Sequence, residues 1–110
     1  MKLLICLTAF AWMLCAQAPA GDANNGKTLF EKNGCWTCHG HMGQGSSAGP
    51  RLGPRPLAAA ALIAYVRHPA GSMPPFTAKV ISDAQLTDIR AYLASVPEPK
   101  PLKEIPLLNQ

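Results

Sequence analysis

The sequence is poor in charged residues, and it holds no cluster of charge of either sign. Charged side chains make up 15% of the 110 residues, and the formal net charge is +4. The lysines and arginines are scattered along the chain, whereas nucleic-acid-binding proteins gather them into a patch or stripe. We therefore expect no nucleic-acid partner.

The sequence also lacks an apolar run long enough to cross a membrane. Residues 3–15 are apolar and uncharged, follow a basic start and precede Ala18-Pro19-Ala20. This run is shorter than the about 20 residues of a spanning helix, and its surroundings are typical of a secretory signal peptide. We predict that residues 1–20 are cleaved and that the mature protein is periplasmic, without a transmembrane span. Lipidation at Cys15 is less favoured, because the bulky Leu14 precedes it.

Cysteine becomes scarce once such a signal is removed. Cys6 and Cys15 leave with the signal, so that only Cys35 and Cys38 remain. A disulfide between these two would close a very short loop and remove little entropy from the unfolded chain. We therefore expect the pair to have a chemical role.

No segment shows the alternation typical of a strand, and no internal repeat is present. Helical spacing and capping residues predict helices over 22–32, 57–67 and 83–95. The segments 40–56 and 68–81 are irregular and carry the glycines and prolines that predict loops. The expected fold class is all-α, with three main helices and two long loops.

Three short helices offer only a thin apolar core for a domain of this length. Small domains often depend on a metal or cofactor for stability, and long loops without secondary structure need something to pack around. The predicted architecture therefore indicates a bound group at its centre.

The stretch CWTCH, residues 35–39, is the strongest chemical signal in the chain. C-x-x-C-H is the attachment signature of c-type haem. It predicts thioether bonds from Cys35 and Cys38, and His39 as an axial ligand of the iron. Zinc binding and disulfide exchange are weaker alternatives. The possible zinc ligands are crowded into seven residues, and the βαβ context of a redox pair is absent.

A second axial ligand can come from the remaining methionines and histidines. His41 and Met42 follow His39 too closely to reach the opposite face of a haem. Met73 is expected to be the ligand, because it lies in an irregular segment that Pro74 and Pro75 restrict. The remaining alternatives are His68 and an open coordination site.

The motifs CWTCH, AGPRLG and GSMPPF, in this order between two flanking helices, resemble those of the small class I c-type cytochromes. The resemblance covers residues 21–96. It implies an all-α fold around one covalently attached haem c in a crevice. It also implies a close crossing of the first and last helices, with Gly26 and Phe30 against Tyr92 and Leu93.

The same resemblance implies roles for residues of the loop after the motif. The carbonyl of Pro50 would accept a hydrogen bond from Nδ1–H of the proximal histidine. Arg51 and Arg55 are candidates to pair with the haem propionates, although solvated loop charge is an almost equal alternative.

Two axial ligands would leave the iron no position for a substrate. We therefore expect a single-electron carrier and not an enzyme, either a free shuttle or the cytochrome subunit of a dehydrogenase. Its partners would be redox proteins: a dehydrogenase as donor, and a terminal oxidase or another cytochrome as acceptor. The alternative is a haem enzyme or gas sensor with an open distal site.

The tail, residues 97–110, follows the predicted cytochrome domain of residues 21–96. Its four prolines predict an extended, polyproline-like path without helix. The tail carries four apolar side chains, Leu102, Ile105, Leu107 and Leu108. They could dock on a partner or pack on the domain itself.

Overall fold

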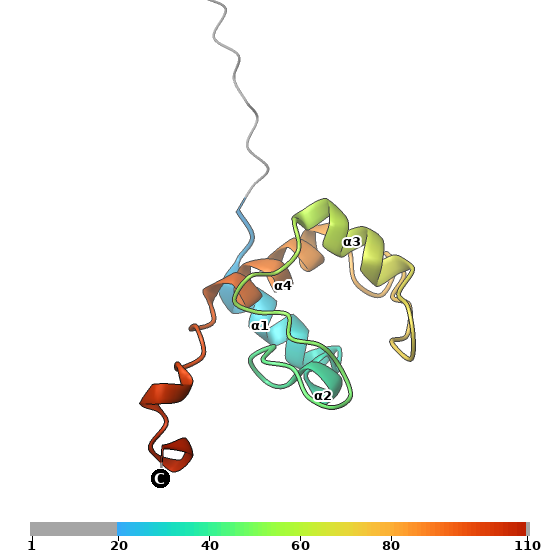
Figure 1. Ribbon diagram of the computed structural model, residues 1–110. Coiled ribbons are helices and arrows are strands. Elements are labelled where there is room, and N and C mark those ends of the chain that lie inside the picture. Colours follow the sequence, from blue (N-terminus) through green and yellow to red (C-terminus); the bar gives the residue numbers. More distant parts are fainter. Residues whose placement is uncertain (1–19, 110) are drawn as a thin grey trace, which may run out of the picture.

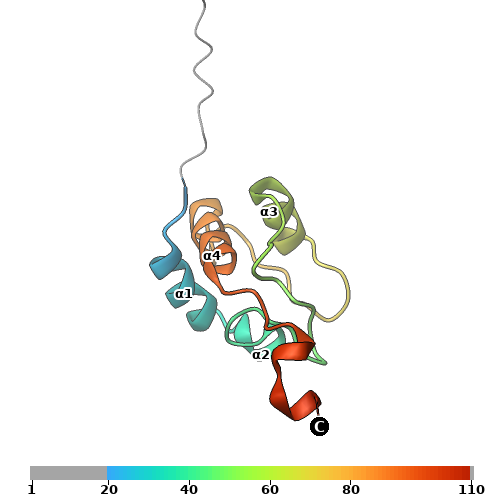
Figure 2. The same cartoon turned by 60° about the vertical axis from the view of Figure 1, so that its left-hand side comes forward.

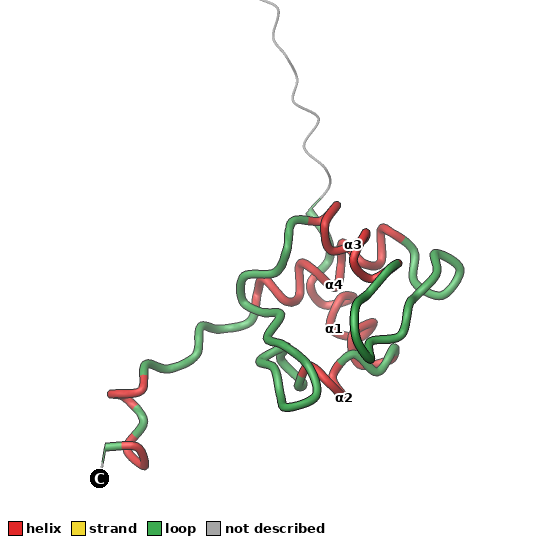
Figure 3. Tube along the Cα trace, turned by 45° about the vertical axis from the view of Figure 1, so that its right-hand side comes forward, coloured by secondary structure: helices red, strands yellow, loops and turns green. Residues whose placement is uncertain are grey.

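A computed structural model describes residues 20–109 of the chain (Figure 1). The predicted signal peptide, apart from Ala20, lies outside the described residues. The elements are α1 (Ala23–Lys32), α2 (Trp36–His39), α3 (Ala59–Arg67) and α4 (Asp83–Ser95), followed by the 3-10 turns η1 (Leu102–Glu104) and η2 (Pro106–Leu108). Within residues 20–109 there is no strand (Figure 3). The predicted all-α fold class is confirmed.

The first and last helices begin where their capping residues predict. The Asp22 carboxylate accepts hydrogen bonds from the backbone amides of Asn24 and Asn25, at 2.8 and 3.2 Å. At the start of α4, the Ser82 hydroxyl accepts from the Gln85 amide, and the Gln85 side chain accepts from the Ser82 amide. This capping box satisfies two amides that have no partner inside the helix.

Helices α1 and α4 cross closely, as expected. A Cβ added at Gly26 would overlap the backbone carbonyl of Asp88, so only glycine permits this approach. Beside it, the rings of Phe30 and Tyr92 pack with their centroids 5.6 Å apart. Figure 2 shows α4 lying between α1 and α3. The buried apolar core is small and consists of Leu29, Phe30, Ile81, Leu86, Ile89, Tyr92 and Leu93.

Helix α3 differs from the prediction at its start. It begins at Ala59, two residues later than expected, because Ala58 is extended and offers no side-chain cap. Leu57 consequently lies outside the helix and is 55% exposed. No residue of α3 is fully buried, although Leu62 and Val66 pack partly against the core. The helix therefore leaves space beneath it.

The short helix α2 was not predicted as an element. It forms because the backbone amides of His39 and Gly40 bond the carbonyls of Cys35 and Trp36, at 3.1 and 2.9 Å. One helical turn thus contains most of the CWTCH motif. The turn brings the two cysteines and the histidine close together.

The tail is not extended throughout as predicted, but contains the two 3-10 turns η1 and η2. Its prolines do not exclude every helical turn, because η2 begins with Pro106, where a missing N–H costs nothing. The two turns extend away from the helices (Figures 1 and 3). Leu102, Leu107 and Leu108 are 73%, 79% and 62% exposed, so they do not pack on the domain.

Within residues 20–109, no helix has both the length and the apolar character needed to cross a bilayer.

Candidate cofactor site

A large cavity of about 770 Å³ opens between the helices and the two long loops. This volume lies in the range of about 300–1,000 Å³ that is typical of ligand and cofactor sites. The wall is formed mostly by apolar side chains, among them Phe30, Leu52, Leu62, Val66, Phe76 and Leu93. It also includes Cys35, Cys38, His39 and Met73. The small core and the uncovered underside of α3 both border this space.

The two cysteines reach the cavity from one helical turn. Cys35 is half-buried at the N-terminus of α2, and Cys38 lies one turn later and is exposed. Burial raises the pKa of the Cys35 thiol, and a hydrogen bond of its backbone opposes this effect only in part. Two thiols on one turn can both bond the same edge of a flat ligand.

His39 is held in one orientation. Its side chain is buried, and its Nδ1 lies 2.8 Å from the carbonyl oxygen of Pro50. A carbonyl oxygen can only accept, so Nδ1 carries the proton and Nε2 keeps its lone pair. Nε2 is therefore the nitrogen that can coordinate a metal. The contact is the one that the resemblance implies for Pro50.

Met73 borders the same cavity from a different part of the chain. It is half-buried in the segment that follows α3 (yellow in Figure 1), and this segment lies apart from α2. Of the candidate second ligands, only Met73 shares the cavity with His39. His68 is exposed at the end of α3, and His41 and Met42 are exposed in the loop after α2, all outside this wall.

These residues fit a haem c. Two thiols and an imidazole on one turn match covalent attachment and proximal coordination, a thioether is available as a second ligand, and apolar side chains suit a porphyrin. Within residues 20–109, no three His, Cys, Asp or Glu side chains are arranged so that they could together hold a metal ion.

Comparison with protein families agrees with this chemistry. Residues 21–93 match the family described as cytochrome c oxidase, cbb3-type, subunit III. The chain belongs to this family of class I c-type cytochromes. Comparisons with curated proteins and with solved structures gave no match. The cytochrome is therefore an electron-transfer protein that binds haem c. Membership of this family also implies that it has redox partner proteins.

The loop after α2 is fastened to the attachment motif of the cytochrome. The amide of Gly45 and the hydroxyl of Ser46 donate to the carbonyls of His39 and Cys38, at 2.8 and 2.6 Å. A Cβ at Gly49 would lie 3.1 Å from the His39 ring, so glycine lets the backbone approach it. The role of Ser46 was not predicted, since a serine in a glycine-rich loop gives no distinctive signal.

Tyr92 connects α4 to the same loop. Its hydroxyl donates to the carbonyl of His41 at 2.7 Å. Burial, and to a smaller degree the negative charge of Glu31, raise the pKa of Tyr92. The neutral phenol that makes this hydrogen bond is thereby favoured. The His41 ring stacks on Trp36, with centroids 4.5 Å apart.

Arg51 and Arg55 both border the cavity and are exposed. Arg55 forms an ion pair of 3.2 Å with Glu98 at the root of the tail. The two side chains are 83% and 59% exposed, so this pair contributes little stability. Within residues 20–109 Arg51 has no ion pair. Both guanidinium groups thus place positive charge at the border of the cavity.

Proposed function

We propose that this cytochrome is a periplasmic single-electron carrier with one covalently attached haem c. Cys35 and Cys38 would hold the haem, and His39 and Met73 would be its axial ligands. The observation that carries the proposal is the cavity itself, because all four side chains border it and no other candidate second ligand does. A single C-x-x-C-H motif in the chain favours one haem.

A bound haem c supplies one-electron redox chemistry at its iron, and a methionine ligand raises the reduction potential. The chain provides the setting for this chemistry. The Pro50 carbonyl keeps the His39 ring in the tautomer with a free Nε2. The apolar side chains of the cavity wall would limit the access of water to the bound haem. Arg51 and Arg55 would neutralise carboxylates at the rim.

Coordination from both sides favours electron transfer over catalysis. A protein whose two axial positions are filled has no site at which a substrate or gas can bind. We therefore propose a carrier and not a haem enzyme or gas sensor. An open distal site would be the property of an enzyme or sensor, and it would be detected as carbon monoxide binding to the reduced protein.

The partners follow from the same reasoning. The cytochrome would accept electrons from a dehydrogenase, as a free shuttle or as its bound subunit, and would pass them to a terminal oxidase or another cytochrome. The exposed leucines of the tail favour docking on such a partner, since they do not pack on the domain. The periplasmic location rests on the secretion signal predicted in residues 1–20.

Purified holo protein tests the proposal. Its mass should exceed that of residues 21–110 by one haem, and the haem should stay bound after denaturation. A redox titration should follow a single one-electron curve. Loss of the haem on denaturation would contradict covalent attachment, and a second redox step would contradict a single centre.

A further inference from the structure

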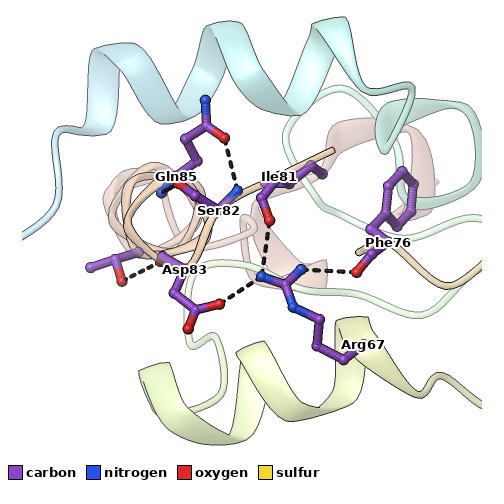
Figure 4. A network of polar contacts seen from close by, with 7 residues as sticks. Arg67, Phe76, Ile81, Ser82, Asp83 and Gln85 are labelled. Carbon is purple, nitrogen blue, oxygen red and sulfur yellow. Dashed lines mark hydrogen bonds and ion pairs between the residues drawn. The ribbon is translucent and has the colours of Figure 1, made fainter. Parts of the chain in front are cut away.

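Arg67, the last residue of α3, is the centre of a polar network beside the cavity (Figure 4). Its Nη1 donates to the carbonyl of Phe76 at 2.9 Å. Its Nη2 donates to the carbonyl of Ile81 at 2.9 Å and to the carboxylate of Asp83 at 2.6 Å. The Arg67 side chain is only 16% exposed, so its hydrogen bonds to the two carbonyls are largely shielded from water, whereas the Asp83 side chain is 67% exposed.

The network closes the segment that carries Met73. The amide of Phe76 donates to the carbonyl of Val66 at 3.1 Å, and the carbonyl of Phe76 accepts from Arg67. Both polar backbone groups of Phe76 are thus fixed to the end of α3. Residues 67–76 form a closed loop, and Met73 lies inside it.

Nothing else in the described chain fixes this loop by hydrogen bonds. Apart from a local turn at residues 71–72, residues 69–75 make no hydrogen bond with any part of residues 20–109. Pro74 and Pro75 stiffen the backbone, but they do not attach it to the domain. The position of Met73 therefore depends on how the two ends of the loop are held, and at the second end the Arg67 guanidinium acts together with the bond between the Phe76 amide and the Val66 carbonyl.

We propose that Arg67 is the positioning residue for the Met73 ligand. The inference rests on the proposed axial role of Met73. When Arg67 donates to Phe76 and Ile81, the loop holds the thioether sulfur at the cavity. Without the guanidinium, the carbonyls of the half-buried Phe76 and the buried Ile81 lose their donor, and the loop opens more often. The loss of one charge-assisted hydrogen bond shifts such an equilibrium by about tenfold or more.

The test uses holo protein with two variants of the same arginine. In Arg67→Ala the fraction of open iron should rise by about tenfold or more, so the reduced protein should bind carbon monoxide at concentrations that leave the wild-type spectrum unchanged, with an affinity that approaches that of Met73→Ala. Arg67→Lys keeps the charge but has one compact donor group, so its affinity should be intermediate. The reduction potential should fall in the same order. The backbone amide of Phe76 should exchange its hydrogen faster in both arginine variants.

Two further variants separate positioning from general stability. Arg90, on α4, also donates a hydrogen bond to a backbone carbonyl, that of Leu57, at 2.7 Å. This bond does not involve the methionine loop, so Arg90→Ala is the matched control. It should lower the melting temperature but leave carbon monoxide binding unchanged. Asp83→Asn should also bind as wild type, because the two carbonyl bonds of Arg67 remain.

The inference is overturned if Arg67→Ala responds to carbon monoxide no more than wild type does, while Met73→Ala binds it tightly. Equal increases in Arg67→Ala and Arg90→Ala would overturn it too. If Met73→Ala does not bind carbon monoxide, Met73 is not the ligand. If the Phe76 amide exchanges its hydrogen at the wild-type rate in Arg67→Ala, Arg67 does not hold the loop closed. If Arg67→Ala cannot be produced with bound haem, Arg67→Lys provides the test. The proposal is overturned if this variant matches wild type both in its response to carbon monoxide and in the hydrogen exchange of the Phe76 amide.

Discussion

A chain that cannot attach haem should lose its native fold. At about 24 cal/mol for each Å³ of dry cavity, the 770 Å³ space sets an upper bound of about 18 kcal/mol on the cost of leaving it unfilled. Domains of this size are stable by only about 5–15 kcal/mol. The seven buried apolar side chains of the core cannot offset such a loss. We therefore expect the protein without haem to collapse into another arrangement or unfold.

The double variant Cys35→Ala, Cys38→Ala, produced without its leader and without bound haem, tests this prediction. Circular dichroism should show much less helix than the holo protein, and heating should produce no cooperative transition. The matched control is the wild-type chain produced in the same way, with free thiols and no haem, which should behave like the variant. Native helix content with a cooperative melt in either haem-free chain would refute the reasoning.

Three further changes test separate parts of the structure. Gly26→Ala should destabilise the holo protein by about 3 kcal/mol in urea, because the added methyl overlaps the Asp88 carbonyl; an unchanged midpoint would contradict the close helix crossing. The raised pKa of Tyr92 favours the neutral phenol in the fold, so stability present below pH 10 should be lost as the pH rises through the folded value. Tyr92→Phe should cost about 1 kcal/mol at neutral pH and flatten that alkaline loss; an equally steep loss in the variant would show that other groups cause it. Deletion of residues 97–110 should lower the melting temperature by less than about 5 °C, since it removes one exposed ion pair, yet weaken binding to the redox partner. A larger drop with unchanged binding would show that the tail only packs on the domain.

The elements that sequence reasoning located well are those with a capping residue at the boundary. Asp22 and Ser82 fix the starts of α1 and α4 through their side-chain oxygens, and these residue types are recognisable. The start of α3 was placed too early, because its alanine-rich beginning has no such marker. In the tail, the prolines excluded a long helix but not 3-10 turns, whose first position accepts Pro106.

The site was predictable where function depends on residue type. Thioether attachment requires cysteine and coordination requires histidine or methionine, so these positions stand out in the sequence. The residues that support them were harder to find. Ser46, Arg67 and Tyr92 all donate to backbone carbonyls. A carbonyl acceptor is present at every residue, so only the fold reveals which donor meets which acceptor.

Carbon monoxide titration of reduced holo protein tests the central claim most directly, with wild type, Met73→Ala and His68→Ala compared. We predict that wild type and His68→Ala keep a low-spin spectrum that carbon monoxide does not change. Met73→Ala should become high-spin, bind carbon monoxide and show a lower reduction potential. Carbon monoxide binding by the wild type would contradict the account, as would a low-spin Met73→Ala with an unchanged potential.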